Sequence, residues 1–267
     1  MALIALAVHD TSENQRTKYT IETLKSLAET VDWTKHRLFI IDNGSCQDTK
    51  DILNHPLLLR SYTNSEGNKF YRPTIITNET NRGTANAINQ AWKFRQPGEH
   101  LIKMDNDVVI HSSGWIEEME QAIARDPGIG QVGLKRKDCG ESPSRTDQLR
   151  SYLQMLPHKN GEPWIIVEAV QHVMGTCVMH NSALIDKIGG LYQMEGVYGF
   201  DDCLMSLRSS IAGFKNVFLP HIHIDHIDVG GDAYCDWKQR YAGEMMGKFN
   251  DTQKKMLSGE ISIKFEL

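Results

Sequence analysis

The chain has 267 residues, 40% of them hydrophobic, and its 29 basic and 34 acidic side chains give a formal net charge of −5. This length and apolar content suit one large α/β domain or two small ones. The mild acidity excludes whole-surface attraction to nucleic acid or to an anionic membrane, although it leaves room for a local basic patch.

No part of the sequence reads as a leader or a membrane span. The apolar run at residues 2–8 lacks a basic flank and is too short for either role. The five cysteines are scattered and include no C-x-x-C pair: Cys46, Cys139, Cys177, Cys203 and Cys235. This usage is typical of a reduced protein, so we expect a cytoplasmic protein without a zinc knuckle.

The first elements alternate between strand and helix. Leu3–Val8 is continuously apolar and predicts a buried strand, Thr17–Thr30 has apolar residues at helical spacing, and Arg37–Ile41 predicts a second strand. Each strand ends in polar turn residues, at 9–12 and 42–45. This order indicates a parallel α/β sheet, which binds ligands beyond the carboxyl ends of its strands.

The next segment combines a loop, a strand and a polar helix start. Residues 51–59 fit a short helix, residues 62–73 a polar loop and Thr74–Thr77 a strand. A helix then opens within Asn81–Asn89, where Asn, Arg and Gly residues precede its apolar face. Such a start suits a bound phosphate, but an ordinary helix cap is the favoured explanation of this motif taken alone.

The apolar run Leu101–Ile110 carries two carboxylates, Asp105 and Asp107. If the run is one strand, the two side chains lie on the same side, because side chains alternate with a period of two. Buried carboxylates so close together repel each other, and a divalent cation relieves the repulsion. The pair therefore predicts a metal and phosphate site.

The middle of the chain turns irregular. Ser112 or Ser113 is expected to cap a helix that ends near Pro127, and Gln131–Leu134 predicts a short strand. Residues 135–163 are polar and contain three prolines. So long a loop is either a functional acceptor-binding or lid region or a solvated insertion.

Further elements follow in the last hundred residues. Residues 164–179 predict two strands meeting near Gly175, and Asn181 or Ser182 caps a helix that runs through Ile188. Another helix begins at Asp201 and Asp202 and ends at Gly213. The final part predicts a strand at 217–220, a helix around Trp237, Tyr241 and Met245, and a short strand at 261–265.

Histidines and acids gather after the strand at 217–220. If this segment is extended, His221, His223 and Asp225 share one face and His226 lies on the other. Only one of these two sets can then face a given site.

The order of these motifs resembles the family 2 glycosyltransferases with the GT-A fold, from Leu3 to about Gly231. The resemblance rests on the opening strand with His9 and Asp10, FIIDNGS with Asp42, Asn81-Arg82-Gly83, Asp105-Asn106-Asp107, the strand led by Gly175, Tyr198-Gly199-Phe200-Asp201-Asp202 with Leu207 and Arg208, and Pro220 with His226. It implies an α/β fold with a Rossmann-like, mixed, mainly parallel central sheet flanked by helices.

The resemblance also implies a division of one domain over residues 1–267. The nucleotide-binding half is expected at about 1–110, the acceptor-binding half at about 111–235 and a C-terminal helical extension at about 236–267.

The activity that the resemblance implies is metal-dependent, inverting transfer of a hexosyl or pentosyl group. The donor is a nucleotide diphosphosugar, with a UDP-sugar expected, and the acceptor is a hydroxyl group. By the motif match, Asp202 is the general base and Asp201 its neighbour. The expected donor-binding residues are His9, Asp10, Asp42, Asn81, Arg82, Gly83, Asp105 and Asn106.

The expected metal is Mn²⁺ or Mg²⁺, bound by Asp105, Asp107 and His226, with His221 and His223 as competitors for the imidazole position. A nitrogen ligand favours Mn²⁺. The cation would neutralise the leaving diphosphate.

The acceptor and the alternatives stay open in the sequence. A glycan, a protein, a small molecule or a modified nucleic-acid base is possible, the last because 135–137 and 145–150 supply a local basic patch. A metal-dependent hydrolase could be built on His221, His223, Asp225 and His226. A nucleotidyltransferase acting on sugar nucleotides would need a glycine-rich loop, which His9–Arg16 lacks. The remaining alternative is a non-catalytic module that binds nucleotide sugars.

Overall fold

The computed structural model describes residues 1–55, 72–137, 151–157, 161–228, 230 and 233–267. They form one ten-stranded sheet in the order β3-β2-β1-β4-β9-β6-β10-β8-β7, with β5 paired to β10. The strands are β1 (Ala2–Val8), β2 (Arg37–Asn43), β3 (Thr74–Asn78), β4 (His100–Met104), β5 (Val108–Ile110), β6 (Ile129–Arg136), β7 (Tyr152–Met155), β8 (Ile166–Val170), β9 (Cys177–His180) and β10 (Lys215–His226).

Helices account for most of the remaining described residues. They are α1 (Thr17–Thr30), α2 (Gln47–Asn54), α3 (Thr84–Trp92), α4 (Trp115–Arg125), α5 (Ser182–Ile188), α6 (Asp201–Ile211) and α7 (Ala233–Ser258). Within the described ranges, none of these helices combines the length and apolar character needed to cross a membrane.

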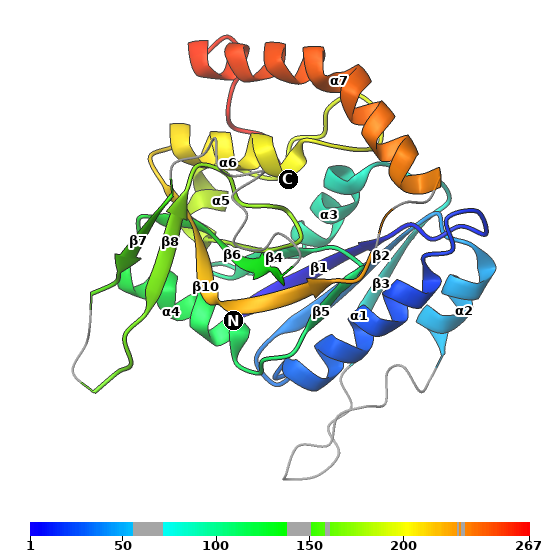
Figure 1. The fold of residues 1–267 in the computed structure, drawn as a ribbon, viewed down its shortest axis with the longest axis horizontal. Helices are drawn as coiled ribbons and strands as arrows, with labels where there is room; N and C mark the ends of the chain where they lie inside the picture. The colour runs from blue at the N-terminus through cyan, green and yellow to red at the C-terminus, as the bar shows by residue number, and fades with distance from the viewer. Residues whose placement is uncertain (56–71, 138–150, 158–160, 229, 231–232) are drawn as a thin grey trace.

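Helices cover both faces of the sheet (Figure 1). Leu24 and Leu27 of α1 and Met119 of α4 pack on one face, while Ile88 of α3 and Leu184 of α5 pack on the other. Helix α7 lies outside this second layer, over α6. The predicted α/β fold with a mixed, helix-flanked sheet is confirmed.

The parallel half of the sheet directs its carboxyl ends to one edge. Strand β1 is buried almost throughout and pairs in parallel with β2 and β4, and β2 pairs in parallel with β3. Strand β9 runs antiparallel between β4 and β6, and places Cys177 opposite Met104. The residues after β1 and β4 therefore lie beside the residues that precede β9.

The predicted single strand over 101–110 is wrong, because the chain turns at Asp105-Asn106-Asp107. The Asp105 N–H donates to the carbonyl of Thr176 at 2.9 Å, next to β9. The Val108 N–H donates to Oγ1 of Thr23 in α1, and β5 pairs with β10 instead of continuing β4. The two carboxylates therefore do not share one side of a strand.

Other boundaries differ in smaller ways. The helix expected at 51–59 begins at Gln47 and ends at Asn54, and α4 follows Gly114, whose φ of 79° suits glycine, instead of a serine cap. Strand β7 lies inside the segment expected to be irregular. The expected final strand is a single bridge between Gly189 and Phe265. Residues 56–71, 138–150 and 158–160, which include most of the two predicted loops, lie outside the described residues.

Candidate functional site

A cavity of about 1070 Å³ lies at the carboxyl edge of β1 and β4. Its walls come from the ends of β1, β4 and β10, from the start of α6 and from α7. The predicted site residues that line it are His9, Asn81, Asp105, Asn106, Asp107, Asp201, Asp202 and His226. Segments that are far apart in sequence therefore meet in one cavity.

Asp10 and Asp42 are not among the described residues that line the cavity. Asp10 is fully buried, and its carboxylate accepts hydrogen bonds from Thr20, Thr49 and Asn106. Burial raises the pKa of Asp10, although these hydrogen bonds act in the opposite direction. Asp42 accepts the backbone N–H of Ser45 at 2.8 Å. Both side chains thus hold the turns that follow the strands.

Asn81 is the member of the Asn-Arg-Gly motif that reaches the cavity. Its Oδ1 accepts from Asn43 at 2.8 Å and from the N–H of Gly83 at 2.9 Å. The Arg82 N–H donates to Oδ1 of Asn43 at 3.1 Å. Gly83 has a φ of 84°, a left-handed conformation that glycine adopts without strain, at the start of α3.

One side of the cavity holds Arg16, Asp107, His226 and Asp228, here called the arginine cluster. Arg16 is only 3% exposed; its guanidinium donates to Oδ2 of Asp107 and, at 2.6 Å, to Oδ2 of Asp228. His226 Nε2 lies 3.3 Å from Oδ2 of Asp107. Burial opposes ionisation of Asp107, but His226 and Arg16 together hold its pKa well below the usual range.

The arginine cluster suits a divalent cation in one respect. Oδ1 of Asp107 is buried and has no hydrogen-bond partner among the described residues. An oxygen in that state gains from a cation, and His226 beside it offers a nitrogen ligand. Asp105 does not join this pair, because its carboxylate is held by Lys103 at 2.8 Å.

A second group in the same cavity comprises Lys103, Asp105, Asp201 and Asp202, here called the lysine cluster. The buried ammonium of Lys103 contacts Asp105, donates to the carbonyl of Gly175 at 2.6 Å and lies 3.9 Å from Asp201. Burial lowers the pKa of Lys103, but the carboxylates outweigh it and raise that pKa. Burial also raises the pKa of Asp201 to about 6, with repulsion from Asp202 and Asp105 adding to the effect and Lys103 opposing it.

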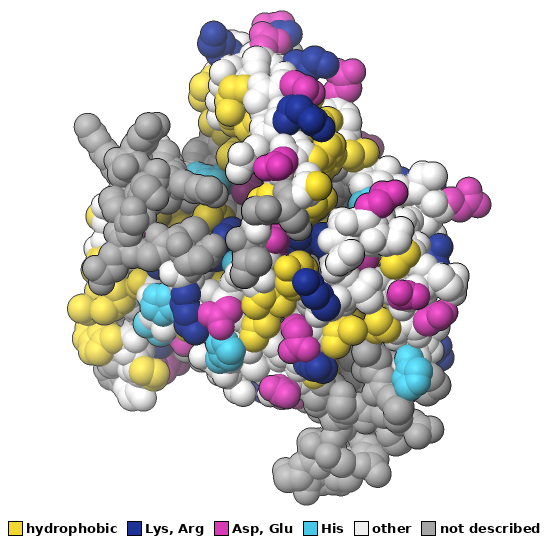
Figure 2. Space-filling view, turned by 45° about the vertical axis from the view of Figure 1, so that its right-hand side comes forward, with side chains coloured by type: hydrophobic (Ala, Val, Ile, Leu, Met, Phe, Trp, Pro, Cys, Tyr) yellow, Lys and Arg dark blue, Asp and Glu magenta, His cyan; other side chains and the backbone are white. Residues whose placement is uncertain are grey.

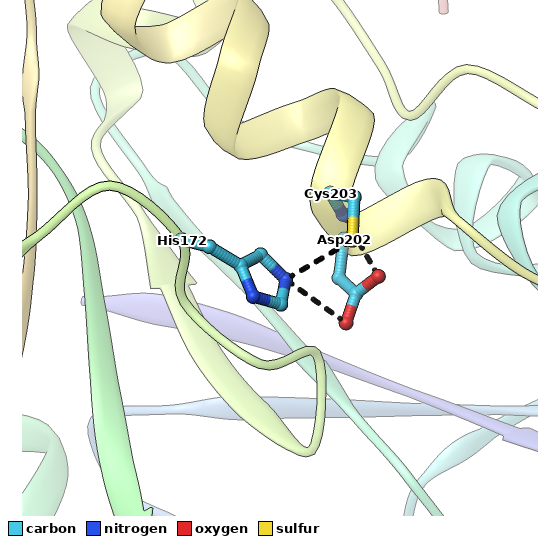
Figure 3. A group of neighbouring side chains, drawn as sticks. All are labelled: His172, Asp202 and Cys203. Carbon is cyan, nitrogen blue, oxygen red and sulfur yellow. Dashed lines mark hydrogen bonds and ion pairs between the residues drawn. The ribbon is translucent and has the colours of Figure 1, made fainter. Parts of the chain in front are cut away.

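Within the lysine cluster, Asp202 is the carboxylate that accepts the most hydrogen bonds. Its Oδ2 accepts the N–H of Gly175 at 3.1 Å and lies 3.4 Å from Nε2 of His172, and its Oδ1 accepts the N–H of Cys203 (Figure 3). Burial opposes ionisation, but His172, Lys103 and Gly175 hold the pKa of Asp202 well below its usual range. Asp202 is therefore a carboxylate, while Asp201 beside it takes a proton near pH 6.

The backbone before these two acids is held in an uncommon conformation. Phe200 has a φ of 64° directly before α6. Its ring stacks on Phe249 of α7, with centroids 4.3 Å apart and an interplanar angle of 13°. A non-glycine residue keeps such a conformation where its surroundings enforce it, so α7 helps to fix where α6 begins.

The histidine segment splits as its alternation predicts. It lies within the extended strand β10, where His221 contacts Glu118, Asp225 contacts His111 at 2.7 Å, and His226 faces Asp107. Of the three candidate histidines, His226 lines the cavity. The four-residue set proposed for a hydrolase is therefore not assembled at one point.

The described part of the predicted basic patch is paired with other groups. Lys135 contacts Glu168 at 2.8 Å, Lys137 contacts Asp225 at 2.9 Å, and Arg136 lies 3.1 Å from His226. Residues 145–150 lie outside the described part of the chain. Basic and acidic side chains also intermingle on the face in Figure 2. This pairing does not favour a nucleic-acid acceptor.

Sequence reasoning missed Arg16, Lys103 and His172, which set the charge of both clusters. Lys103 gave a usable signal, because it is the one charged residue of an otherwise apolar, buried strand interior. No sequence pattern indicates Arg16 or His172, because their partners Asp107 and Asp202 lie 91 and 30 residues away in the chain. Aromatic residues of the cavity wall were also missed, including Tyr234 and Trp237 of α7, whose rings stack.

Known proteins resemble this chain in sequence and in fold. Residues 13–189 match the model of glycosyl transferase family 2. The protein y4gI of Sinorhizobium fredii is 22% identical over 231 residues, which are 82% of this chain and 24% of that protein.

Solved structures share the fold at low identity. A mannosyltransferase from Pyrobaculum calidifontis in complex with GDP-Man and Mn²⁺ has a TM-score of 0.63 at 16% identity, over 90% of this chain and 60% of the other. GalNAc-T7 with UDP, GalNAc and Mn²⁺ has a TM-score of 0.62 at 14% identity, over 85% of this chain and 43% of the other. Residues 1–349 of TarS from S. aureus in complex with UDP-GlcNAc have a TM-score of 0.56 at 15% identity, over 87% of this chain and 62% of the other.

The chain thus spans a quarter to about three fifths of the length of these relatives. The likeness to the solved structures confirms the expected GT-A fold, and the family match covers well over half of the chain. The chain belongs to glycosyl transferase family 2.

Proposed function

We propose that the chain is a metal-dependent, inverting glycosyltransferase that moves a sugar from a nucleotide diphosphosugar to an acceptor hydroxyl, with Asp202 as general base. The observation that carries the proposal is that the arginine cluster and the lysine cluster line one and the same cavity. It combines a place for a cation and a diphosphate with an ionised carboxylate for the acceptor.

The arginine cluster supports donor binding. A cation held by Asp107 and His226 would act as a Lewis acid on the leaving diphosphate. Arg16 keeps Asp107 ionised. His9, Asn81 and Asn106 line the same cavity and would contact the nucleotide, whereas Asp10, Asp42, Arg82 and Gly83 would act by shaping the neighbouring turns.

The lysine cluster supports proton transfer. The inverting reaction needs one carboxylate that takes the proton from the attacking hydroxyl, and Asp202 is held ionised by its donors. Asp105 would bind the donor sugar beside the base, because Lys103 orients it toward this side of the cavity. Asp201 would bind the acceptor or orient the base.

A UDP-sugar is our proposed donor and Mn²⁺ our proposed cation. Relatives of the same fold bind UDP or GDP-Man, and two of them bind Mn²⁺. Tyr234 and Trp237 add flat apolar surfaces to the cavity, which suit a nucleobase or a sugar ring. We propose that residues 1–110 bind the donor, 111–235 the acceptor, and 236–267 extend the cavity wall.

The acceptor is proposed to be a glycan, a protein or a small molecule. The paired basic side chains at 135–137 do not favour a modified nucleic-acid base. Four cysteines in the described ranges are free thiols, which supports the proposal of a reducing, cytoplasmic location.

Substitution of Asp202 by Asn tests the base. We expect transfer to fall by about 100-fold or more, while Mn²⁺-dependent binding of the nucleotide stays unchanged. Sugar transfer from a panel of nucleotide sugars and nucleotide affinity are measured on the same samples. Full transfer activity in this variant would remove Asp202 as the base, and loss of nucleotide binding would also count against that assignment. Binding of nucleotide sugars by a wild-type protein that transfers none of them would support a non-catalytic module.

Substitution of Asp107 by Ala tests the cation site. We expect nucleotide affinity in Mn²⁺ to fall by about tenfold or more. Unchanged affinity would remove Asp107 from the metal site.

Release of free sugar at the same rate with and without acceptors would favour the hydrolase.

A further inference from the structure

Three side chains of different chemistry converge beside the proposed base. His172 comes from the segment after β8, and Asp202 and Cys203 come from the first turn of α6 (Figure 3). His172 Nε2 lies 3.4 Å from Oδ2 of Asp202 and 3.5 Å from Sγ of Cys203, and all three ligand atoms lie within 4.8 Å of one another. In the proposed transfer reaction the imidazole only helps to keep Asp202 ionised, and the thiol has no role.

These spacings match the edges of a zinc tetrahedron. With bonds of about 2.1 Å from Zn²⁺ to N and O and about 2.3 Å to S, a tetrahedral site has edges of about 3.4 Å from N to O and about 3.6 Å from N to S. The two distances from His172 already have nearly these values. The third edge, from the Asp202 carboxylate to Sγ of Cys203, is at most 4.8 Å, so one ion could contact all three atoms once this edge shortens.

The charge and the surroundings also favour a cation. The lysine cluster contains three carboxylates and one ammonium, so a divalent ion would balance its charge. All three ligands line the cavity, which leaves a fourth position open to water or to a bound molecule. A set of nitrogen, oxygen and sulfur atoms prefers Zn²⁺, whereas Mn²⁺ and Mg²⁺ prefer oxygen ligands.

We propose that His172, Asp202 and Cys203 form a zinc site, separate from the Mn²⁺ site at Asp107 and His226, and that zinc bound there inhibits transfer. The ion would bind the carboxylate of Asp202 and so compete with the acceptor proton for the proposed base. Cys203 binds as the thiolate and releases its proton to solvent. Zinc binding stands on the geometry alone; the inhibition rests on the proposed function.

The binding test uses the full chain without nucleotide. Zn²⁺ is titrated by calorimetry into the wild-type protein, Cys203→Ser and His172→Gln. We expect both variants to lose one zinc equivalent or to bind it at least tenfold more weakly. Cys46→Ser is the matched control, because Cys46 is a half-buried thiol outside the cavity, and it should bind as the wild type does.

A second measurement covers variants that fold poorly. Co²⁺ bound by a thiolate has a charge-transfer absorption, which should appear with the wild-type protein and Cys46→Ser and be absent with Cys203→Ser. No zinc equivalent in the wild-type protein, or identical zinc binding and Co²⁺ spectra in Cys203→Ser, would overturn the site.

The inhibition test measures transfer in excess Mn²⁺, with and without a tenfold excess of Zn²⁺ over protein. Wild-type activity should fall at least tenfold, and Cys203→Ser should stay within twofold of its own zinc-free rate. Zinc binding without inhibition would overturn the inhibitory role and question Asp202 as base, while leaving the site intact. A chain that transfers no sugar under any condition would refute the proposed function and the inhibition with it, and the binding arm would still decide the site.

Discussion

The two clusters that line the cavity neutralise their carboxylates with different cations. In the arginine cluster, one guanidinium donates to two carboxylates, and Lys238 lies 3.8 Å from one of them. In the lysine cluster, one ammonium serves three carboxylates. The arginine cluster is thus close to neutral, whereas the lysine cluster keeps excess negative charge, which adds to the burial that raises the pKa of Asp201 to about 6.

The difference teaches how one cavity can bind anions and accept protons. A diphosphate needs a neutral or positive wall, and the forked guanidinium provides it with fixed geometry. A general base needs an ionised carboxylate, and the donors around Asp202 keep it in that state. Substitutions that alter the charge of one cluster at a time can break this comparison.

The largest effect is expected for Lys103→Met. Removal of the ammonium leaves three buried or half-buried carboxylates without their cation, so the free energy of unfolding should fall by about 3 to 5 kcal/mol. Urea denaturation measures it. Lys35→Met is the matched control, since Lys35 is an exposed lysine that also contacts two acids, and little change is expected there. An equal fall in the free energy of unfolding in both variants would show that the carboxylates of the lysine cluster do not depend on Lys103 for neutralisation.

A smaller loss is expected for Arg16→Lys. Lysine keeps the charge but cannot donate along two fixed directions to Asp107 and Asp228, so we expect a loss of about 2 kcal/mol. Arg95→Lys removes a guanidinium that contacts only Asp186 among acids, and serves as control. Wild-type stability of Arg16→Lys would mean that the fork is not needed and that the two clusters are equivalent.

A pH-dependent gain is expected for Asp201→Asn. The folded state holds the Asp201 proton up to about pH 6, and the unfolded state releases it near the usual value of 3.8. The wild-type protein therefore loses stability at this residue as pH rises between these values and stays lower above them. Asn removes the charge, so the variant should be more stable than wild type by about 3 kcal/mol at pH 7.5 and nearly equal to it at pH 4. Thermal melts at both pH values measure the stability of the two proteins, and Glu22→Gln at an exposed position is the control. A stability difference between Asp201→Asn and wild type that is the same at both pH values would contradict this prediction.

The smallest effect is expected for His221→Ala. His221 contacts Glu118 outside the cavity, so nucleotide affinity in Mn²⁺ should change less than twofold. His226→Ala should weaken it about tenfold. The reverse order would move the proposed metal ligand from His226 to His221.

Local patterns predicted the parts of the fold that depend on neighbouring residues. Helix α1 spans the predicted Thr17–Thr30, the two strands around Gly175 are present, and Asn181 caps α5 through the N–H of Ala183. The face split of His221 and His226 also followed from alternation alone. These features follow from periodicity and capping, which a sequence carries directly.

The charge balance of the cavity could not be predicted in this way. The pair Asp105 and Asp107 looked like one site, but the turn between them sends the first to Lys103 and the second to Arg16. Which cation meets which acid is decided by sheet order and by the turn, both of which depend on contacts between distant segments. The same holds for His172 beside Asp202.

The stacking of Phe200 on Phe249 ties the proposed base to the last helix. The family match ends at residue 189, so both aromatic residues lie beyond the region that defines the family. The left-handed backbone at Phe200 is tolerated there because α7 presses on its ring. Homologues that lack α7 or orient it differently should carry glycine at this position, and those that keep it should conserve both rings together.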